Sequence, residues 1–228
     1  MQCIVHTPTN TTSNSEHFYQ TLGFKKVPSD SQLLFTDGKV VIEVNPQRQA
    51  RAGIKLYQPS WEKETEKLAG ITHLTKLDNG YMLADPSGVW IYLVEGEPDW
   101  QMEEAENSYS ELGNFMGVTL ETTDLTRSDA LYEALGFTRT WGTVEKGMVA
   151  FDHNGFGISV MKALQCPHLF FNPSISYFNG ANNLAVIEKI RALNIPITEE
   201  ITHFNKEGKV DNIIIRDPGG YGYFIFSD

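Results

Sequence analysis

His6 and Glu43 are the residues of the N-terminal half whose side chains could do chemistry together. A histidine that titrates near neutrality acts as a general acid or base when a carboxylate lies within hydrogen-bond reach of its ring. An imidazole and a carboxylate can equally be two ligands of a divalent metal ion, although such an ion ordinarily needs at least three protein ligands. A histidine in a strand is also often a purely structural residue. His6 and Glu43 are therefore candidate catalytic residues, with catalysis, metal binding and a structural role all open.

The other reactive residue types form no recognisable motif. No two histidines have the i, i+2 or i, i+4 spacing of a metal-binding motif. The sequence contains no Gly-rich phosphate-binding loop, no nucleophile elbow and no Cys-x-x-Cys pair. Cys3 has no activating neighbour, so we do not expect a reactive thiol there.

The elements that must position these side chains occur twice in the sequence. The stretch "VHTPTNTTSNSEHFYQTLGF" (5–24) aligns without a gap with "VTLETTDLTRSDALYEALGF" (118–137), at an offset of 113 residues, 118 − 5. Tyr19 and Tyr132 are among the identical positions, as are the two Leu-Gly-Phe triplets. Each stretch predicts a strand followed by a short helix that ends at a glycine. The chain is therefore a tandem duplication.

Each copy continues with further strands and a second helix. Asp37-Gly38 and Asn154-Gly155 predict hairpin turns within 32–44 and 146–161. Residues 61–68 and 182–194 predict helices, the latter with one buried stripe formed by Leu184, Ile187, Ile190 and Leu193. The copies close with "DPSGVWIYLVE" (85–95) and "DPGGYGYFIF" (217–226), each a turn that leads into a strand. Each half therefore contains two βαβββ units, which makes the fold class α+β.

The repeat also predicts the domain boundaries. We expect a first domain over 1–95 and a second over 115–228, because each interval holds one complete copy. Residues 96–114 are polar and acidic and are the predicted linker.

Composition and charge limit the partners. The 228 residues include 29 acidic and 18 basic ones, for a formal net charge of −11. An acidic surface repels phosphate backbones and anionic lipids, so we expect neither nucleic acid nor membrane as a partner. The start "MQCIVHTPTN" lacks the basic and apolar regions of a signal peptide. With two cysteines in the chain, these features predict a cytoplasmic protein.

These motifs resemble those of the vicinal oxygen chelate superfamily, which includes glyoxalase I, bleomycin-resistance proteins and extradiol dioxygenases. "FYQTLGF" and "LYEALGF" are similar to its first-helix signature, and the two Asp-Pro-x-Gly strands are similar to its closing signature. The resemblance covers 1–95 and 115–228. It implies two glyoxalase-like domains, four modules in all, whose curled mixed sheets form cups.

The resemblance also implies where a metal ion would bind. Enzymes of this superfamily usually hold one divalent ion in a cup, with ligands from four strand positions. In this chain those positions fall on Ile4, Glu43, near Gly53 and Tyr92 in the first half, and on Gly117, Ser159, near Ser174 or Ile175, and Phe224 in the second. Only Glu43 has a group that can neutralise a dication. The resemblance therefore implies the scaffold without its metal centre, and we expect no cofactor.

Strand alternation, applied to the same register, predicts what lines each cup. The first cup is expected to present Gln2, His6, Glu43, Trp90 and Tyr92. The second is expected to present Thr119 and Glu121, with Gly222, Phe224 and Phe226 opposite. Such aromatic walls favour flat or cationic ligands, although Phe224 and Phe226 could instead simply fill the second cup.

Three functional hypotheses follow from this lining. The first is a metal-free protein that binds a small aromatic or cationic molecule, with Gln2, His6, Glu43, Trp90, Tyr92, Thr119, Glu121 and Phe224 as ligand-binding residues. The second is a metal-dependent lyase, isomerase or ring-cleaving dioxygenase with displaced ligands, His6 and Glu43 among them. The third is an interaction protein whose cups are filled. The small molecule is the expected partner, and the tandem arrangement is compatible with a monomer or a homodimer.

Overall fold

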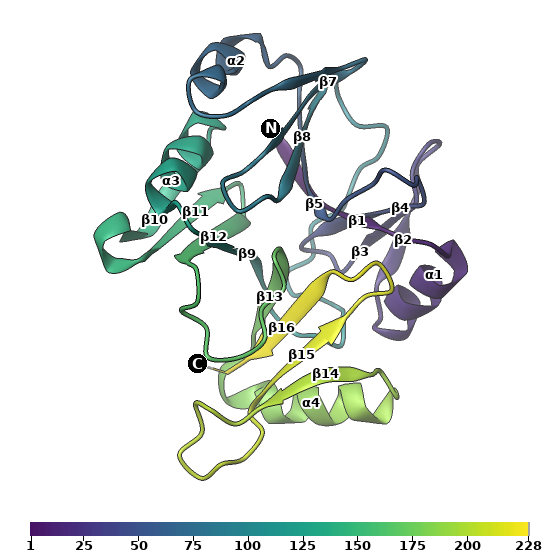
Figure 1. Cartoon of the computed structure of the whole chain (residues 1–228). Coiled ribbons are helices and arrows are strands. Elements are labelled where there is room, and N and C mark those ends of the chain that lie inside the picture. The colour runs from purple at the N-terminus through teal and green to yellow at the C-terminus, as the bar shows by residue number, and fades with distance from the viewer. Residues whose placement is uncertain (228) are drawn as a thin grey trace.

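The computed structural model describes residues 1–227, so Asp228, the last residue of the predicted second domain, lies outside the described residues. The chain forms two eight-stranded mixed sheets, and each sheet takes all its strands from one half of the sequence (Figure 1). Four helices accompany the sheets within the described residues. The predicted α+β class with tandem βαβββ units is confirmed.

The first half has the order strand, helix, four strands, helix, three strands. Its elements are β1 (Gln2–Pro8), α1 (Thr12–Thr21), β2 (Lys25–Val27), β3 (Leu34–Thr36), β4 (Val41–Asn45), β5 (Gly53–Gln58), α2 (Glu62–Ala69), β6 (Thr75–Leu77), β7 (Gly80–Ala84) and β8 (Trp90–Glu95). The strands lie side by side in the order β2-β3-β4-β1-β5-β8-β7-β6.

The second half repeats this plan. Its elements are β9 (Phe115–Thr122), α3 (Leu125–Ala134), β10 (Thr138–Thr143), a 3₁₀ turn at Val144–Lys146, β11 (Met148–His153), β12 (Phe156–Lys162), β13 (Ser174–Phe178), a 3₁₀ turn at Gly180–Asn182, α4 (Asn183–Ala192), β14 (Ile197–Ile201), β15 (Asn212–Arg216) and β16 (Gly222–Phe226). The strand order β10-β11-β12-β9-β13-β16-β15-β14 is that of the first sheet, element for element.

Four central strands carry the candidate site residues in each half. In the first sheet β1 pairs in parallel with β4 and antiparallel with β5, and β5 pairs in parallel with β8. In the second sheet β9 pairs in parallel with β12 and antiparallel with β13, and β13 pairs in parallel with β16. Residues that alternate along these strands share one face of the sheet, so the predicted cup residues of each half lie on a common surface.

The predicted hairpin turns are present and depend on glycine. Gly38 follows β3 with φ of 89°, and Gly155 joins β11 to β12 with φ of 83°. Residues with a Cβ rarely adopt this left-handed backbone. A Cβ at Gly38 would also lie 2.6 Å from the side chain of Ala105. Gly38 is therefore needed both for the turn and for the close approach of the 96–114 segment.

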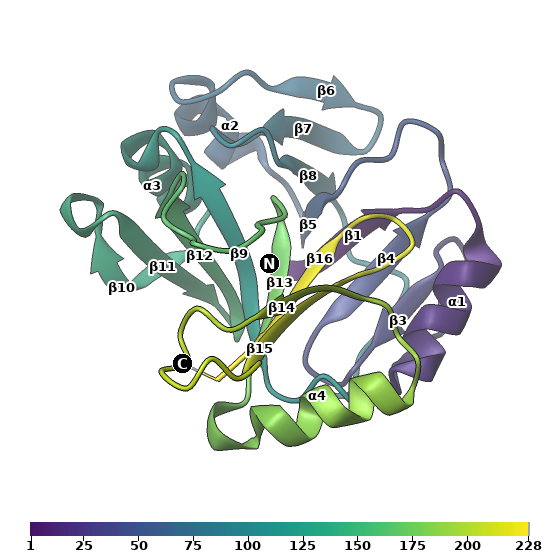
Figure 2. The ribbon, with the colours of Figure 1, turned by 60° about the horizontal axis from the view of Figure 1, so that its bottom comes forward.

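The first helix of each half contacts the opposite half. Figures 1 and 2 place α1 of the first half beside the turn between β15 and β16 of the second. The hydroxyl of Tyr19 on α1 donates a hydrogen bond of 2.9 Å to Asp217 in that turn. The hydroxyl of Tyr132 on α3 donates one of 3.1 Å to Asp85 in the turn between β7 and β8. The two halves therefore share one core, in which both tyrosines are fully buried.

The stripe predicted for α4 is only partly right. Ile187 and Ile190 are buried, but Leu184 is 54% exposed. Residues three apart on a helix are rotated by about 300°, which is about 60° short of a full turn. Over the three steps from position 184 to position 193 this difference adds up to about 180°. Leu184 therefore lies on the far side of α4 from Leu193, and the two cannot belong to one narrow stripe.

Residues 96–114, all of which the structure describes, form no helix or strand but pack closely against the first sheet. Trp100 and Leu112 are buried, and the backbone amides of Ala105 and Tyr109 donate to the carbonyls of Gly38 and Asp37. No helix within residues 1–227 has the length and apolar character needed to cross a lipid bilayer.

Candidate functional site

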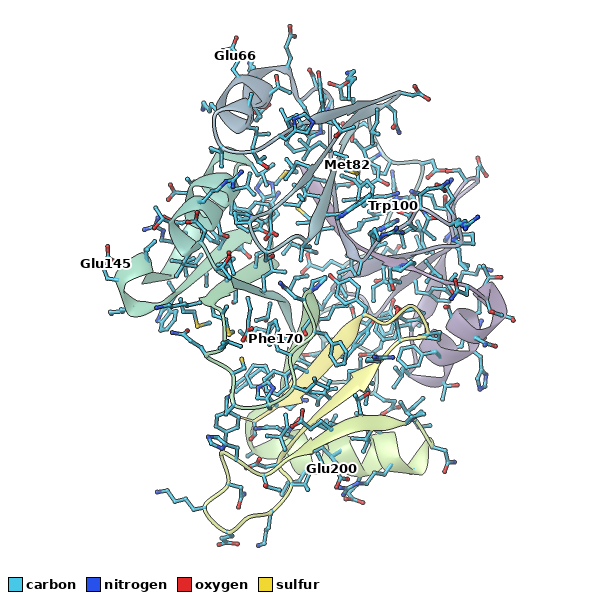
Figure 3. The ribbon with its side chains drawn as sticks, viewed as in Figure 1. Glu66, Met82, Trp100, Glu145, Phe170 and Glu200 are labelled. Atoms are coloured by element: carbon cyan, nitrogen blue, oxygen red, sulfur yellow. The ribbon has the colours of Figure 1, made fainter. Side chains whose placement is uncertain are left out.

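The first cup contains a cavity of about 490 Å³. Its wall comes from β1, β4, β5, β6, β7 and β8, from the turn between β6 and β7, and from the loops that follow β4 and precede β3. The lining residues are His6, Ser31, Gln32, Glu43, Asn45, Gln47, Gln49, Ala50, Lys55, Leu77, Asn79, Tyr81, Met82, Trp90, Tyr92, Leu93 and Val94. In Figure 3, Met82 marks the β7 side of this cup and Trp100 lies nearby, on the 96–114 segment. Amide and aromatic side chains predominate among the lining groups.

An ion pair occupies the centre of the cup. The ammonium Nζ of Lys55 lies 2.6 Å from Oε2 of Glu43, and the two side chains are 14% and 6% exposed. Lys55 stands level with Ile4 on one neighbouring strand and with Tyr92 on the other. The ammonium therefore lies on the surface where the resemblance placed a metal ion, and it forms an ion pair with Glu43, whose Oε2 accepts no hydrogen bond.

His6 is neutral and has both ring nitrogens engaged. Its Nδ1 lies 2.7 Å from the backbone carbonyl of Arg51 and must donate, because a carbonyl only accepts. Its Nε2 then accepts from the side-chain amide of Asn45 at 3.1 Å. The pKa of His6 is lowered to about 4, chiefly by burial and then by the charge of Lys55, while the hydrogen bond to the Arg51 carbonyl opposes both. With this pKa, His6 is a weak base at neutral pH.

Two aromatic rings form one wall of the cavity. The ring centroids of Trp90 and Tyr92 are 6.0 Å apart, and Tyr92 lies 4.7 Å from the ring of His6. Burial raises the pKa of the Tyr92 hydroxyl, so that it stays protonated. The guanidinium of Arg51 lies 5.7 Å from the Trp90 ring, and Lys55 Nζ lies 5.7 Å from the Tyr92 ring. The protein's own cations thus already flank both rings.

The structure brings four of the five residues predicted for the first cup to the cavity: His6, Glu43, Trp90 and Tyr92. Gln2 lies apart from them, exposed, on a separate groove of about 190 Å³ that Cys3 and Trp100 also line. Gln2 does share a strand face with Ile4 and His6, but Ile4 packs in a buried cluster with Trp100. That cluster separates Gln2 from the cavity.

In the second cup the predicted residues largely contact the protein itself. Thr119 hydrogen-bonds Ser176 at 2.7 Å, and the rings of Phe224 and Phe226 stack 4.8 Å apart. Phe224 also stacks on His168, with centroids 4.7 Å apart. His168 belongs to the segment after β12 that covers this cup, the segment that contains Phe170 in Figure 3. The expected slot at Phe224 is therefore filled on one side by a ring of the chain.

Glu121 is held by the same covering segment. Its carboxylate Oε2 accepts from the backbone amide of Leu164 at 3.4 Å, and its backbone carbonyl accepts from the side chain of Asn172 at 2.8 Å. Glu121 thus lies at the edge of the second cup and fastens the segment that covers it.

The donor set of the first cup does not fit a divalent metal ion. Glu43 is paired with an ammonium, and both nitrogens of His6 have hydrogen-bond partners. Across residues 1–227, no three His, Cys, Asp or Glu side chains come together in a way that could hold a metal. Displaced ligands at His6 and Glu43 would lack the third protein ligand that such a site ordinarily needs.

Sequence reasoning missed Lys55, the cation of this site, as well as the amide side chains and Tyr81 that line the cavity. Lys55 lies two residues beyond Gly53, the position considered for the third ligand, and so shares that residue's face of the strand. The alternation that predicted Trp90 and Tyr92 would also have predicted Lys55, had it been applied to this strand.

Comparison with known proteins supports the fold. No protein-family model matches the chain, and no curated protein matches it in sequence. Among solved structures, homoprotocatechuate 2,3-dioxygenase from Arthrobacter globiformis superposes with a TM-score of 0.64 at 14% identity, over 99% of this chain and 78% of that one. An Mn(II)-bound glyoxalase from Novosphingobium aromaticivorans gives 0.60 at 13% identity, over 97% and 79%. A halotolerant catechol dioxygenase gives 0.54 at 14% identity, over 97% and 84%.

These similarities extend over nearly the whole chain and concern its architecture. Together with the two sheets of identical strand order and the repeated helix and closing motifs, they show that the chain has the tandem-domain fold of the vicinal oxygen chelate superfamily.

Proposed function

We propose that this protein binds a small aromatic molecule in its first cup, and that it does so without a divalent metal ion. The observation that carries the proposal is the cavity of about 490 Å³, walled by Trp90 and Tyr92, whose metal position holds the ion pair of Lys55 and Glu43. A concave site of this size with aromatic walls and a few polar groups is typical of small-molecule binding.

The lining favours a planar ligand with polar substituents. The rings of Trp90, Tyr92 and Tyr81 offer faces for stacking. The amides of Gln32, Asn45, Gln47, Gln49 and Asn79 supply both donors and acceptors. A cationic ligand has less support, because Arg51 and Lys55 already lie near the two principal rings. Catechol, the aromatic compound in the name of one similar dioxygenase, is a reasonable first probe.

Binding is better supported than catalysis. His6 has a pKa of about 4 and accepts a hydrogen bond at the nitrogen that would have to take up a proton. A general base works best with a pKa near the operating pH and a free lone pair. Glu43 is engaged by Lys55. Neither candidate catalytic residue is therefore poised for proton transfer in this arrangement.

The test is a screen of aromatic fragments by ligand-observed NMR, followed by titration of three proteins. Tyr92→Ala removes a ring from the first cup, and Phe224→Ala removes the ring at the matching position of the second. We expect fragments to bind the wild type and Phe224→Ala equally and to lose at least tenfold in affinity for Tyr92→Ala, since an aromatic contact contributes about 1 kcal/mol beyond its buried area. Loss of binding in Phe224→Ala alone would contradict the assignment of the site to the first cup.

A further inference from the structure

The fold does not require an ion pair at the centre of the cup, because the second half does without one. In the first sheet Lys55 stands level with Ile4 and Tyr92, and Glu43 stands level with His6. In the second sheet Ser176 stands level with Gly117 and Phe224, and Ser159 with Thr119. Ser176 and Ser159 thus occupy the places of Lys55 and Glu43. The same four-strand centre forms with two hydroxyls in place of two charges.

Folding stability does not explain the charges of Lys55 and Glu43 either. Taking an ammonium and a carboxylate out of water is expensive, and their attraction only roughly offsets that expense. Neutral groups of similar size are often as stable or more stable. The pair of Lys55 and Glu43 is largely buried, and the second half shows that neutral groups fit the same position. A role toward a ligand explains the pair better than a role in folding.

The ammonium of Lys55 has donors left for a ligand. A lysine Nζ carries three N–H groups, and the carboxylate of Glu43 lies on one side of it at 2.6 Å. Lys55 lines the cavity together with Tyr92 and Trp90. A ligand in contact with those rings would therefore lie beside the ammonium.

The charges around the cavity favour a negative partner. Glu43 is the only acidic side chain among the lining residues, and it is already paired. His6 is neutral, and Arg51 adds a second cation beside Trp90. With two cations against one carboxylate, an anionic oxygen gains attraction here and a ligand cation is repelled.

We propose that Lys55 binds an anionic oxygen, a carboxylate or a phenolate, of the aromatic ligand, and so replaces the metal ion of related cups with a side-chain ammonium. This inference rests on the proposed function and specifies the chemical class of its ligand as an aromatic acid.

The experiment compares matched probes on matched proteins. The probes are benzoate and 2-hydroxybenzoate, their neutral counterparts benzamide and 2-hydroxybenzamide, and benzyltrimethylammonium. The proteins are the wild type, Glu43→Gln, the double variant Glu43→Gln/Lys55→Met, Tyr92→Ala, and Trp141→Ala, which removes an exposed ring outside the first cup, as a control. The double variant removes both charges together, so no buried charge is left unpaired, and near-ultraviolet circular dichroism checks its fold. Dissociation constants are measured by NMR titration.

We expect the wild type and Trp141→Ala to bind each acid at least tenfold more tightly than its amide, as a charged hydrogen bond predicts. Glu43→Gln, which frees the ammonium, should bind the acids more tightly still. The double variant should bind acid and amide alike. Equal binding of acid and amide by the wild type, or a preference that survives in the double variant, overturns the inference.

The outcome also separates this inference from the proposed function. Amides that bind the wild type and are lost in Tyr92→Ala, without any preference for acids, leave the aromatic site standing and refute only the role of Lys55. Binding of benzyltrimethylammonium in preference to the acids refutes it as well. If no probe binds the first cup at all, the proposed function and this inference fall together.

Discussion

Tyr19 on the first helix donates a hydrogen bond of 2.9 Å to Asp217 in the last turn of the chain, 198 residues away. Its repeat partner Tyr132 donates in the opposite direction, to Asp85 of the first half, at 3.1 Å. Both aspartates also cap their own turns, since Asp217 accepts from the amide of Tyr221 and Asp85 from that of Val89. The first-helix motif of each half is therefore hydrogen-bonded to the Asp-Pro-x-Gly turn of the other half.

Removing these hydroxyls should destabilise the protein. Tyr19→Phe and Tyr132→Phe each deprive a buried carboxylate of a donor, which costs about 1–3 kcal/mol. Burial already raises the pKa of Asp85 and Asp217, and the tyrosine hydroxyls oppose that rise. We expect the larger loss in Tyr19→Phe, because its hydroxyl also bonds that of Tyr223 at 2.9 Å. Urea denaturation gives the free energy of unfolding, with the half-buried Tyr81→Phe as control; losses no larger than the control's would contradict this account.

The ion pair of the first cup makes a prediction about stability that is independent of any ligand. Lys55→Met alone leaves Glu43 buried without its ammonium and should cost about 3–5 kcal/mol. Glu43→Gln/Lys55→Met should recover most of that loss, because the second half builds the same centre from Ser159 and Ser176. A double-mutant cycle by urea denaturation measures both. A double variant less stable than Lys55→Met would show that the charges are needed for folding.

Acid should destabilise the protein through His6. Its pKa is about 4 in the folded protein, against 6.5 for a free histidine. Between these values the unfolded chain binds a proton that the folded chain does not, so this contribution to stability is complete above pH 6.5 and is lost as the pH falls to 4. The loss is about 3 kcal/mol. Asp85 and Asp217 act in the opposite sense, because their raised pKa values make the folded state the stronger proton binder.

Comparison with His6→Gln isolates the histidine, since the aspartates contribute equally to both proteins. Unfolding free energies measured from pH 7 to pH 4 should fall more steeply for the wild type than for the variant. Parallel curves would mean that His6 is protonated as easily in the folded protein as in the unfolded one.

Trp100 joins the 96–114 segment to the base of the first cup. It is 6% exposed and meets Tyr57 edge to face at 6.1 Å, in a cluster with Ile4 and Leu34. Trp100→Ala should cost about 3–5 kcal/mol, the usual range for a buried tryptophan. The exposed Trp141, which is 61% accessible, offers the matched control. Thermal unfolding of the two variants tests this, and equal melting temperatures would contradict the packing role of the segment.

The fold could be predicted from the sequence because its signals are local and occur twice. The helix that ends at Gly23 recurs at Gly136, and the hairpin glycines Gly38 and Gly155 mark the same turn in each half. A repeated local signal predicts the same unit in both places. The resemblance then supplied the arrangement in two glyoxalase-like domains whose mixed sheets form cups.

The site could be predicted from the sequence only where strand alternation determines which side chains face the cavity. Alternation, applied to the register that the resemblance implies, placed His6, Glu43, Trp90 and Tyr92 at one cavity. It could not foresee that Ile4 and Trp100 would close the cup between His6 and Gln2. That closure depends on a segment without regular structure, whose path no sequence period indicates. The same holds for His168, which covers Phe224 from an irregular segment.

The most direct test of the central claim is an aromatic-fragment titration on protein dialysed against EDTA, repeated after addition of Mn²⁺, Fe²⁺ or Zn²⁺. The best fragment from the screen serves as the probe, and metal content per chain is measured in parallel by plasma mass spectrometry. We predict the same dissociation constant with and without each metal, and a loss of binding in Tyr92→Ala. Binding that appears only with a metal ion bound stoichiometrically would contradict the account and would make His6 and Glu43 the first ligands to examine.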